Sequence, residues 1–156
     1  MKNKRVGVFE TNSSSVHSIC IQKEPVTDVA GQVIDFEFGE YGWECDYYYD
    51  TPSYLHTAMI EIGMESEFND LVNKLENEYG VVCRVKEKTG DRYFENGYVD
   101  HADKLKELID MLLANDDMML KFLLGKNSII YTGNDNDDIE TGSKSEETHY
   151  VYWKYN

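Results

Sequence analysis

Apolar and polar residues alternate along several stretches of the chain in the way typical of half-buried β-strands. Between Gln32 and Phe38, Ile34 and Phe36 fall on one face of such a strand, and acidic residues fall on the other. Comparable strands are predicted for residues 5–10, 16–22, 81–86, 128–132 and 148–155, with a shorter one near 93–94. Because only a short segment joins the first two, we expect residues 5–10 and 16–22 to form a hairpin.

Apolar residues at helical spacing predict four helices between these strands. Thr51 and Pro52 are typical of a helix start, with a capping side chain followed by proline in the first turn. Ser66 and Asp116 are the expected caps of the second and fourth helices, and Gly80 is the expected end of the second. The helices are expected at residues 51–62, 66–79, about 100–113, and 118–124.

The order of these elements, strands then helices then strands, predicts an α+β fold. We expect a mainly antiparallel sheet with three to four helices packed on one of its faces. The length of 156 residues is sufficient for one domain with a substantial core, so residues 1–156 are predicted to form a single domain.

The net charge of the chain limits the classes of molecule that it can bind. The chain has 30 acidic and 15 basic residues, a formal net charge of −15. Direct binding to nucleic acid or to an anionic membrane would require the opposite sign, and no apolar run is long enough to predict a membrane span. Metal ions, basic peptides and basic protein surfaces remain as partners. The alternative is that the charge only keeps the protein from associating.

A run of hydroxyl and other polar side chains lies between the first two predicted strands. Such a turn could hold an anion, although the glycines and lysine of a phosphate-binding loop are missing. Ser15 and His17 would share a face of the strand, but no orienting carboxylate can be located, so no catalytic residue is assigned. The alternative is a turn held by its own side chains. The candidate ligand-binding residues are Arg5, Asn12, Ser13, Ser14, Ser15 and His17.

The same run carries a resemblance to a known group of proteins. The pattern R-x-G-x-F-E-T-N-S-S-S-x-H-S, from Arg5 to Ser18, resembles the N-terminal signature of small uncharacterised proteins encoded by bacteriophages and prophages. It covers about fourteen residues, under a tenth of the chain, and brings no chemistry with it. The resemblance implies a setting, the cytoplasm of a bacterial host cell, and an accessory role.

Residues 37–50 combine acidic and aromatic side chains and contain no base. Arginine pairs with carboxylates and stacks on aromatic rings, so this composition suits a basic partner surface. Acids two apart on a strand stand about 6.7 Å apart, close to two phosphate steps of about 3.4 Å along DNA. The alternative is a loop whose aromatic rings face the core. The candidate partner-binding residues here are Glu40, Tyr41, Trp43, Glu44, Asp46, Tyr48 and Asp50.

A second acidic segment lies within residues 133–145. It superficially resembles a calcium-binding loop, but Glu140 stands where that loop requires glycine, so an EF-hand is rejected and a weak, non-specific cation site remains as an alternative. A solvated loop that extends the anionic face is the expectation. Its candidate partner-binding residues are Asp135, Asp137, Asp138 and Glu140.

Histidine and cysteine give no metal signature. The four histidines lie on different predicted elements, and His56 and His101 are expected at the surface or at helix ends. The three cysteines are widely spaced, which indicates reduced thiols in a cytosol. We therefore expect no metal ligands and no cofactor.

Together these patterns favour a non-enzymatic, acidic phage or prophage accessory protein. It would bind a basic surface of a host protein, such as a nucleic-acid-binding or defence protein, as a nucleic-acid mimic or an anti-defence inhibitor. One alternative is an enzyme, or a protein that binds a nucleotide or another small ligand, using the motif from Asn12 to Ser15 with His17. A second is a structural component of the virion or its assembly. The oligomeric state cannot be predicted from these features.

Overall fold

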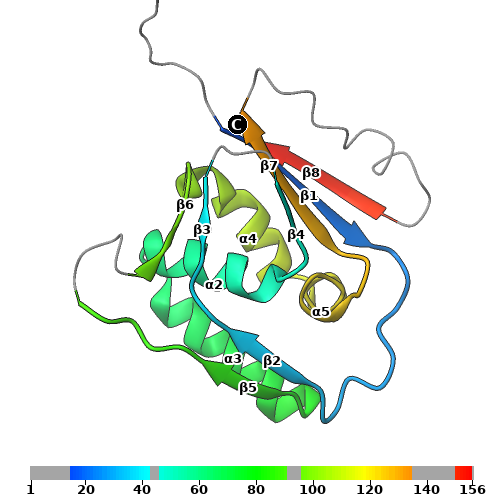
Figure 1. Cartoon of the computed structure of the whole chain (residues 1–156). Helices are drawn as coiled ribbons and strands as arrows, with labels where there is room; N and C mark the ends of the chain where they lie inside the picture. The colour runs from blue at the N-terminus through cyan, green and yellow to red at the C-terminus, as the bar shows by residue number, and fades with distance from the viewer. Residues whose placement is uncertain (1–14, 43–45, 91–95, 135–149, 156) are drawn as a thin grey trace, which may run out of the picture.

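The computed structural model describes residues 15–42, 46–90, 96–134 and 150–155 of the chain. Its elements follow the predicted order of strands, helices and strands, which confirms the α+β class (Figure 1). The strands are β1 (Ser15–Gln22), β2 (Val33–Phe36), β3 (Glu40–Tyr41), β4 (Asp46–Tyr48), β5 (Val82–Val85), β6 (Tyr98–Val99), β7 (Ile129–Asn134) and β8 (Tyr150–Tyr155). The helices are α2 (Thr51–Glu61), α3 (Glu65–Tyr79), the short 3-10 helix η2 (Ala102–Leu105), α4 (Lys106–Leu113) and α5 (Asp116–Leu124).

The largest sheet has four antiparallel strands in the order β4-β7-β1-β8. The helices lie on one side of it, and α5 packs against β1 (Figure 1). Strand β1 pairs with β7 along one edge and with β8 along the other, so His17 to Cys20 have a neighbour on both sides. The predicted hairpin with residues 5–10 is therefore wrong for this part of β1, because both edges are taken. Residues 5–10 themselves lie outside the described residues.

Two short parallel pairs were not predicted. Strand β2 pairs with β5, and β3 pairs with β6, both in parallel. In β2 the expected alternation is confirmed, because Ile34 and Phe36 are buried and Val33 and Asp35 are exposed. The strand predicted near residues 93–94 lies outside the described residues.

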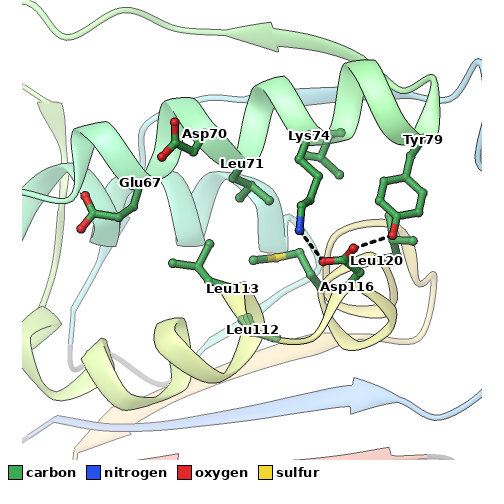
Figure 2. Close-up of a pocket in the computed structure, with 11 residues that line it drawn as sticks. Glu67, Asp70, Leu71, Lys74, Tyr79, Leu112, Leu113, Asp116 and Leu120 are labelled. Atoms are coloured by element: carbon green, nitrogen blue, oxygen red, sulfur yellow. Dashed lines mark hydrogen bonds and ion pairs between the residues drawn. The ribbon is translucent and has the colours of Figure 1, made fainter.

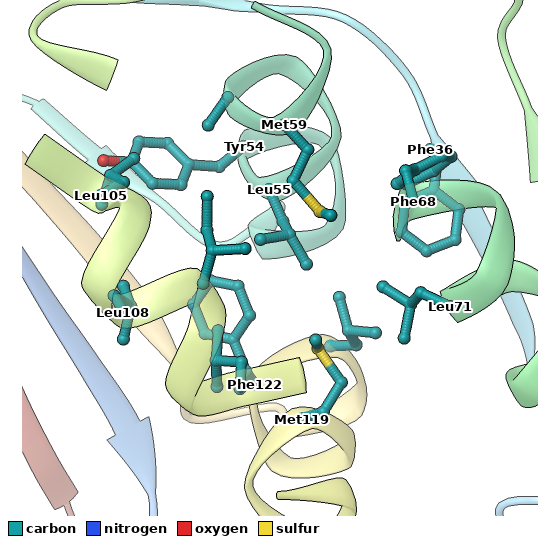
Figure 3. Packing of buried hydrophobic residues seen from close by; sticks show 14 of the residues in the cluster. Phe36, Tyr54, Leu55, Met59, Phe68, Leu71, Leu105, Leu108, Met119 and Phe122 are labelled. Carbon is teal, nitrogen blue, oxygen red and sulfur yellow. The ribbon is translucent and has the colours of Figure 1, made fainter. Parts of the chain in front are cut away.

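The main core lies between the helices and one face of the sheet. Ile19, Ile21 and Ile130 reach it from β1 and β7, and Tyr54 and Phe122 reach it from α2 and α5. Figure 3 shows how Phe36 and Phe68 meet near Leu71 on one side of this core. On the opposite face of the sheet, a small second cluster contains Cys20, Ile129 and Tyr131.

Helix ends differ from the prediction by one or two residues. Asp50, not Thr51, caps α2, since its carboxylate accepts a hydrogen bond from the Ser53 N–H at 3.2 Å. Helix α3 begins at Glu65, so Ser66 lies inside the first turn and is not its cap.

Asn115, not Asp116, caps α5, and its side-chain oxygen accepts from the Met118 N–H at 3.0 Å. The predicted stop at Gly80 is confirmed, because this residue ends α3 in the left-handed conformation with φ of 70°.

Candidate functional site

His17, the one member of the ligand-binding motif whose side chain is described, is completely buried in the middle of the sheet. Its Nδ1 lies 2.8 Å from the hydroxyl oxygen of Tyr54, and its Nε2 lies 3.2 Å from the carbonyl oxygen of Gly42. A carbonyl oxygen can only accept, so Nε2 carries the proton and Nδ1 accepts from the Tyr54 hydroxyl. Burial lowers the pKa of His17 to about 4, which keeps the ring neutral. This geometry suits a structural bridge from β1 to α2.

The other members of this motif do not form a described site with His17. Ser15 belongs to the start of β1, whereas Arg5, Asn12, Ser13 and Ser14 lie outside the described residues. Arg84 could have supplied positive charge. It is exposed on β5, however, and holds the Asp35 carboxylate through two hydrogen bonds of 2.6 and 3.0 Å. The described part of the motif therefore provides a core contact and no assembled anion site.

The segment from Glu40 to Asp50 divides its tyrosines between two environments. Tyr41 is only 4% exposed, and its ring meets those of Tyr48 and Tyr54 edge-on at 4.9 and 5.0 Å. Tyr47 and Tyr49 are 58% and 68% exposed. The prediction of Tyr41 as a partner-binding residue is wrong for its ring, which is taken up by the core, and Tyr48 is half-buried against the same core.

The exposed residues of this segment lie on or next to β4, which is an edge strand of the four-stranded sheet. Asp46 and Asp50 are exposed there with Tyr47 and Tyr49, and we call these four residues the β4 face. The Tyr47 ring stands edge-on to Tyr131 of β7 at 4.8 Å, which fixes its position. Tyr47 and Tyr49 were not among the candidate residues, because the sequence alone did not show which tyrosines alternate outward.

The carboxylates of Asp46 and Asp50 are held by backbone N–H groups and not by basic side chains of the described residues. Asp46 accepts a hydrogen bond from the Tyr47 N–H at 2.8 Å, and Asp50 caps α2. Among the described residues, no lysine or arginine forms an ion pair with Glu40, Asp46 or Asp50. The β4 face thus exposes two carboxylates and two tyrosines along one edge of the sheet, with Asp46 and Tyr47 on opposite sides of the strand.

The remaining predicted partner-binding residues belong to two segments of the chain. Trp43 and Glu44 lie outside the described residues, as do Asp135, Asp137, Asp138 and Glu140. In the parts of the chain that are described, no group of three or more histidine, cysteine or acidic residues is arranged to hold a metal ion.

The expectation that His56 lies at the surface is wrong. This residue is 1% exposed, and its ring is stacked between Phe38 and Phe68 with centroids 4.3 and 4.5 Å away. Its Nδ1 lies 2.9 Å from the carbonyl oxygen of Glu37, and burial lowers its pKa. His56 therefore joins β2 and α3 within the core. His101 does precede a helix, at the start of η2, and is exposed as expected.

Of the two described cysteines, Cys20 is buried in β1 and Cys83 is partly buried on β5. Burial raises the pKa of Cys83 to about 11, so this thiol stays protonated at neutral pH. A protonated thiol is a poor nucleophile, and Cys83 therefore does not suit covalent catalysis.

A groove between α3, α4 and α5 was missed by the sequence reasoning (Figure 2). Leu71 and Leu75 are buried side chains of α3, and the helices leave an open hollow of about 220 Å³ above them. At one end Asp116 accepts hydrogen bonds from Lys74 Nζ at 2.9 Å and from the Tyr79 hydroxyl at 2.7 Å. No signal in the sequence locates this groove, because it depends on how three helices diverge.

Comparison with known proteins identifies no relative: no family model matches the chain, and neither the curated proteins nor the solved structures include a significant match. Among the described residues, no helix has both the length and the apolar character that crossing a bilayer requires.

Proposed function

We propose that this protein acts by binding, and that its β4 face occupies a basic surface on another protein. The setting that we propose is a bacterial cell that carries a phage or prophage, with the protein acting in the cytoplasm as an accessory factor. A nucleic-acid-binding or defence protein of the host is the natural partner, because its basic surface is built to hold phosphates. The protein would then act as a nucleic-acid mimic.

The observation that carries this proposal is the presence of exposed tyrosines and of carboxylates without an ion pair on and next to β4. Tyr47 and Tyr49 are both more than half exposed, although tyrosine is a residue that folding usually places at least partly inside. Asp46 and Asp50 flank them without a cation from the described part of the chain. An arginine side chain can stack on such a ring, for about 0.5–1 kcal/mol, and pair with a neighbouring carboxylate.

The surroundings of the two buried histidines favour binding over catalysis. His17 is neutral, and both of its ring nitrogens are taken up by Tyr54 and Gly42. His56 is stacked between two aromatic rings inside the core. His17 therefore has no nitrogen available to a substrate, as a general base would need.

The proposal predicts capture of a basic protein in a salt-dependent way. The tagged protein would be immobilised and exposed to bacterial host lysate at about 50 mM and about 300 mM salt, since exposed charges are screened over this range. We expect basic proteins to be retained at low salt and largely lost at high salt. If no basic protein is retained at low salt, or if retention is insensitive to salt, the electrostatic interpretation fails.

Variants that remove charge from different surfaces show which surface binds the basic protein. Asp46→Asn with Asp50→Asn neutralises the β4 face, and asparagine at position 50 can still cap α2. Glu76→Gln with Glu107→Gln removes the same charge from exposed positions on α3 and α4. We expect the first pair to reduce retention several-fold more than the second. Equal effects would show that only the total charge matters.

Competition tests the nucleic-acid mimicry separately. Excess duplex DNA should release the retained protein if both occupy the same basic surface. Retention that DNA does not affect would contradict the mimicry while leaving a basic partner in place. A stable oligomer of this chain that retains no basic protein would instead favour the virion or assembly role.

A further inference from the structure

The groove between α3, α4 and α5 has an apolar floor whose side chains are not all buried in the core. We call it the α3–α5 groove. Leu113 and Leu120, on α4 and α5, are only partly buried, whereas Leu71, Leu75, Leu112 and Met119 complete the floor from below. Partly exposed leucines around a hollow are the feature that a partner's apolar side chain can cover.

One end of the groove is closed by a fixed polar network. The Asp116 carboxylate joins Lys74 and Tyr79 of α3 to the start of α5 (Figure 2). The hydrogen bond from Lys74 and then that from Tyr79 lower the pKa of Asp116, so the carboxylate stays charged and matched to Lys74. This end offers no spare charge to a partner.

The other end carries charge without a counterion. Glu67 and Asp70 lie on α3 at the end of the groove away from Asp116 (Figure 2). Neither forms an ion pair among the described residues. By contrast, Asp110 on α4 pairs with Lys106 at 2.6 Å, and Asp117 on α5 pairs with Lys121 at 2.8 Å. The rim is therefore unbalanced toward negative charge at one end only.

The size of the groove favours a side chain over a small-molecule ligand. Its volume of about 220 Å³ is below the range of roughly 300–1,000 Å³ that is usual for such ligands. It can hold one or two large apolar side chains. A groove between helices with an apolar floor and a charged rim is the typical receptor of an amphipathic helix.

We propose that the α3–α5 groove binds a basic amphipathic helix of another protein. A leucine or phenylalanine of that helix would cover Leu113 and Leu120, and a lysine or arginine one turn away would pair with Glu67 or Asp70. This inference shares a basic partner with the proposed function but uses different residues, and it stands if the β4 face binds nothing.

The test uses a synthetic probe and the full-length protein. The probe is a fluorescent 15-residue helical peptide with leucines on one face and arginines elsewhere, and its binding is followed by anisotropy. A peptide of the same composition with scrambled order loses the apolar face but keeps the charge. Leu113→Gln places an amide on the groove floor. Met111→Gln makes the same change at a partly buried position of α4 that does not line the groove.

We expect Leu113→Gln to weaken binding of the amphipathic peptide about tenfold or more, and Met111→Gln to leave it unchanged. Glu67→Gln with Asp70→Asn should weaken it about threefold to fivefold at low salt and much less at high salt. The Asp46→Asn, Asp50→Asn protein should bind the peptide normally, which separates this site from the β4 face. Circular dichroism confirms that each variant is folded before it is compared.

Three results would overturn the inference. One is equal binding of the scrambled peptide, which would show that charge alone is recognised. Another is binding that Leu113→Gln does not change. The third is concentration-dependent dimerisation of the protein that Leu113→Gln abolishes, which would identify a second copy of this chain as the occupant of the groove.

Discussion

The short segment from β3 to the start of α2 contains tyrosines in two opposite environments. We call those that pack in the core inward and those of the β4 face outward. Tyr41 and Tyr48 turn toward the core, where Tyr41 meets Tyr54 of α2. Tyr47 and Tyr49 turn toward solvent. Because successive side chains of a strand point to opposite faces, the same composition supplies both a core contact and an exposed surface.

This difference separates residues that stabilise the fold from residues that remain available for a partner. An inward tyrosine is held by neighbouring rings, so its removal should be measured as lost stability. An outward tyrosine contributes little to folding, so its removal should be measured as lost binding. Four predictions test this division, in order of decreasing effect on the free energy of unfolding.

The largest effect is expected for Tyr54→Ala. Tyr54 is 1% exposed, contacts the ring of Tyr41 and donates to His17. Loss of a large buried aromatic side chain typically costs about 3–5 kcal/mol. Urea unfolding measures the cost, with Tyr49→Ala as the control that should change stability by less than about 0.5 kcal/mol. Similar costs for the two variants would contradict the division between inward and outward residues.

Lowering the pH should reduce the stability of the folded protein through protonation of His17, which belongs to the buried side. Its pKa is about 4 in the folded protein and 6.5 in the unfolded chain, so the unfolded state takes up the proton first. Stability is therefore retained above pH 6.5 and falls as the pH drops toward 4, by about 3 kcal/mol from this residue at about 1.36 kcal/mol per pKa unit.

His17→Gln provides the control for this pH dependence. Glutamine can donate to Gly42 and accept from Tyr54 without titrating. The variant keeps the contribution of His56, whose pKa burial also lowers. We expect unfolding curves measured between pH 7 and about pH 4 to show a smaller loss of stability than in the unchanged protein. Parallel pH profiles would show that His17 is not buried as a neutral ring.

Gly97→Ala should weaken the pairing of β3 with β6, and Tyr41 belongs to β3. Gly97 has φ of 71°, and an added Cβ would overlap the carbonyl oxygen of Gly39 beside the β3–β6 pair. A strained left-handed residue costs about 1–3 kcal/mol. Gly63→Ala is the matched control, since Gly63 has φ of 79° but open space at its Cβ. Thermal unfolding should show a larger loss for position 97, and equal losses would mean that only backbone strain matters.

The smallest change in stability is expected on the β4 face. Tyr47→Ala removes the contact with Tyr131 and should cost about 1 kcal/mol, whereas Tyr49→Ala should be nearly neutral. Chemical denaturation of both variants measures these values. A cost well above 1 kcal/mol for Tyr49→Ala would place this residue in the folded core and remove it from the candidate surface.

Local sequence patterns were sufficient for the main elements of the fold. The alternation in β2 and the glycine at the end of α3 follow from strand and helix geometry alone. Partners across the sheet were not predictable in this way: β1 lies between β7 and β8, which come from the far end of the chain. The alternation of residues along a strand does not specify which other strands pair with it in the sheet.

The environment of single side chains was the hardest feature to predict. His56 lies on a helix between Leu55 and Thr57, and its burial comes from Phe38 and Phe68, which arrive from other elements and enclose it. The outward position of Tyr47 depends on its register with Tyr131. The α3–α5 groove depends on helix packing, which no local period encodes.

The most direct test of the central claim compares binding and stability in one variant, Tyr47→Ala with Tyr49→Ala. The claim is that the outward tyrosines serve a basic partner and the inward ones serve the fold. We predict that the double variant loses about tenfold or more of the basic protein retained from host lysate while its stability falls by only about 1 kcal/mol. Unchanged retention by a folded double variant would contradict the claim.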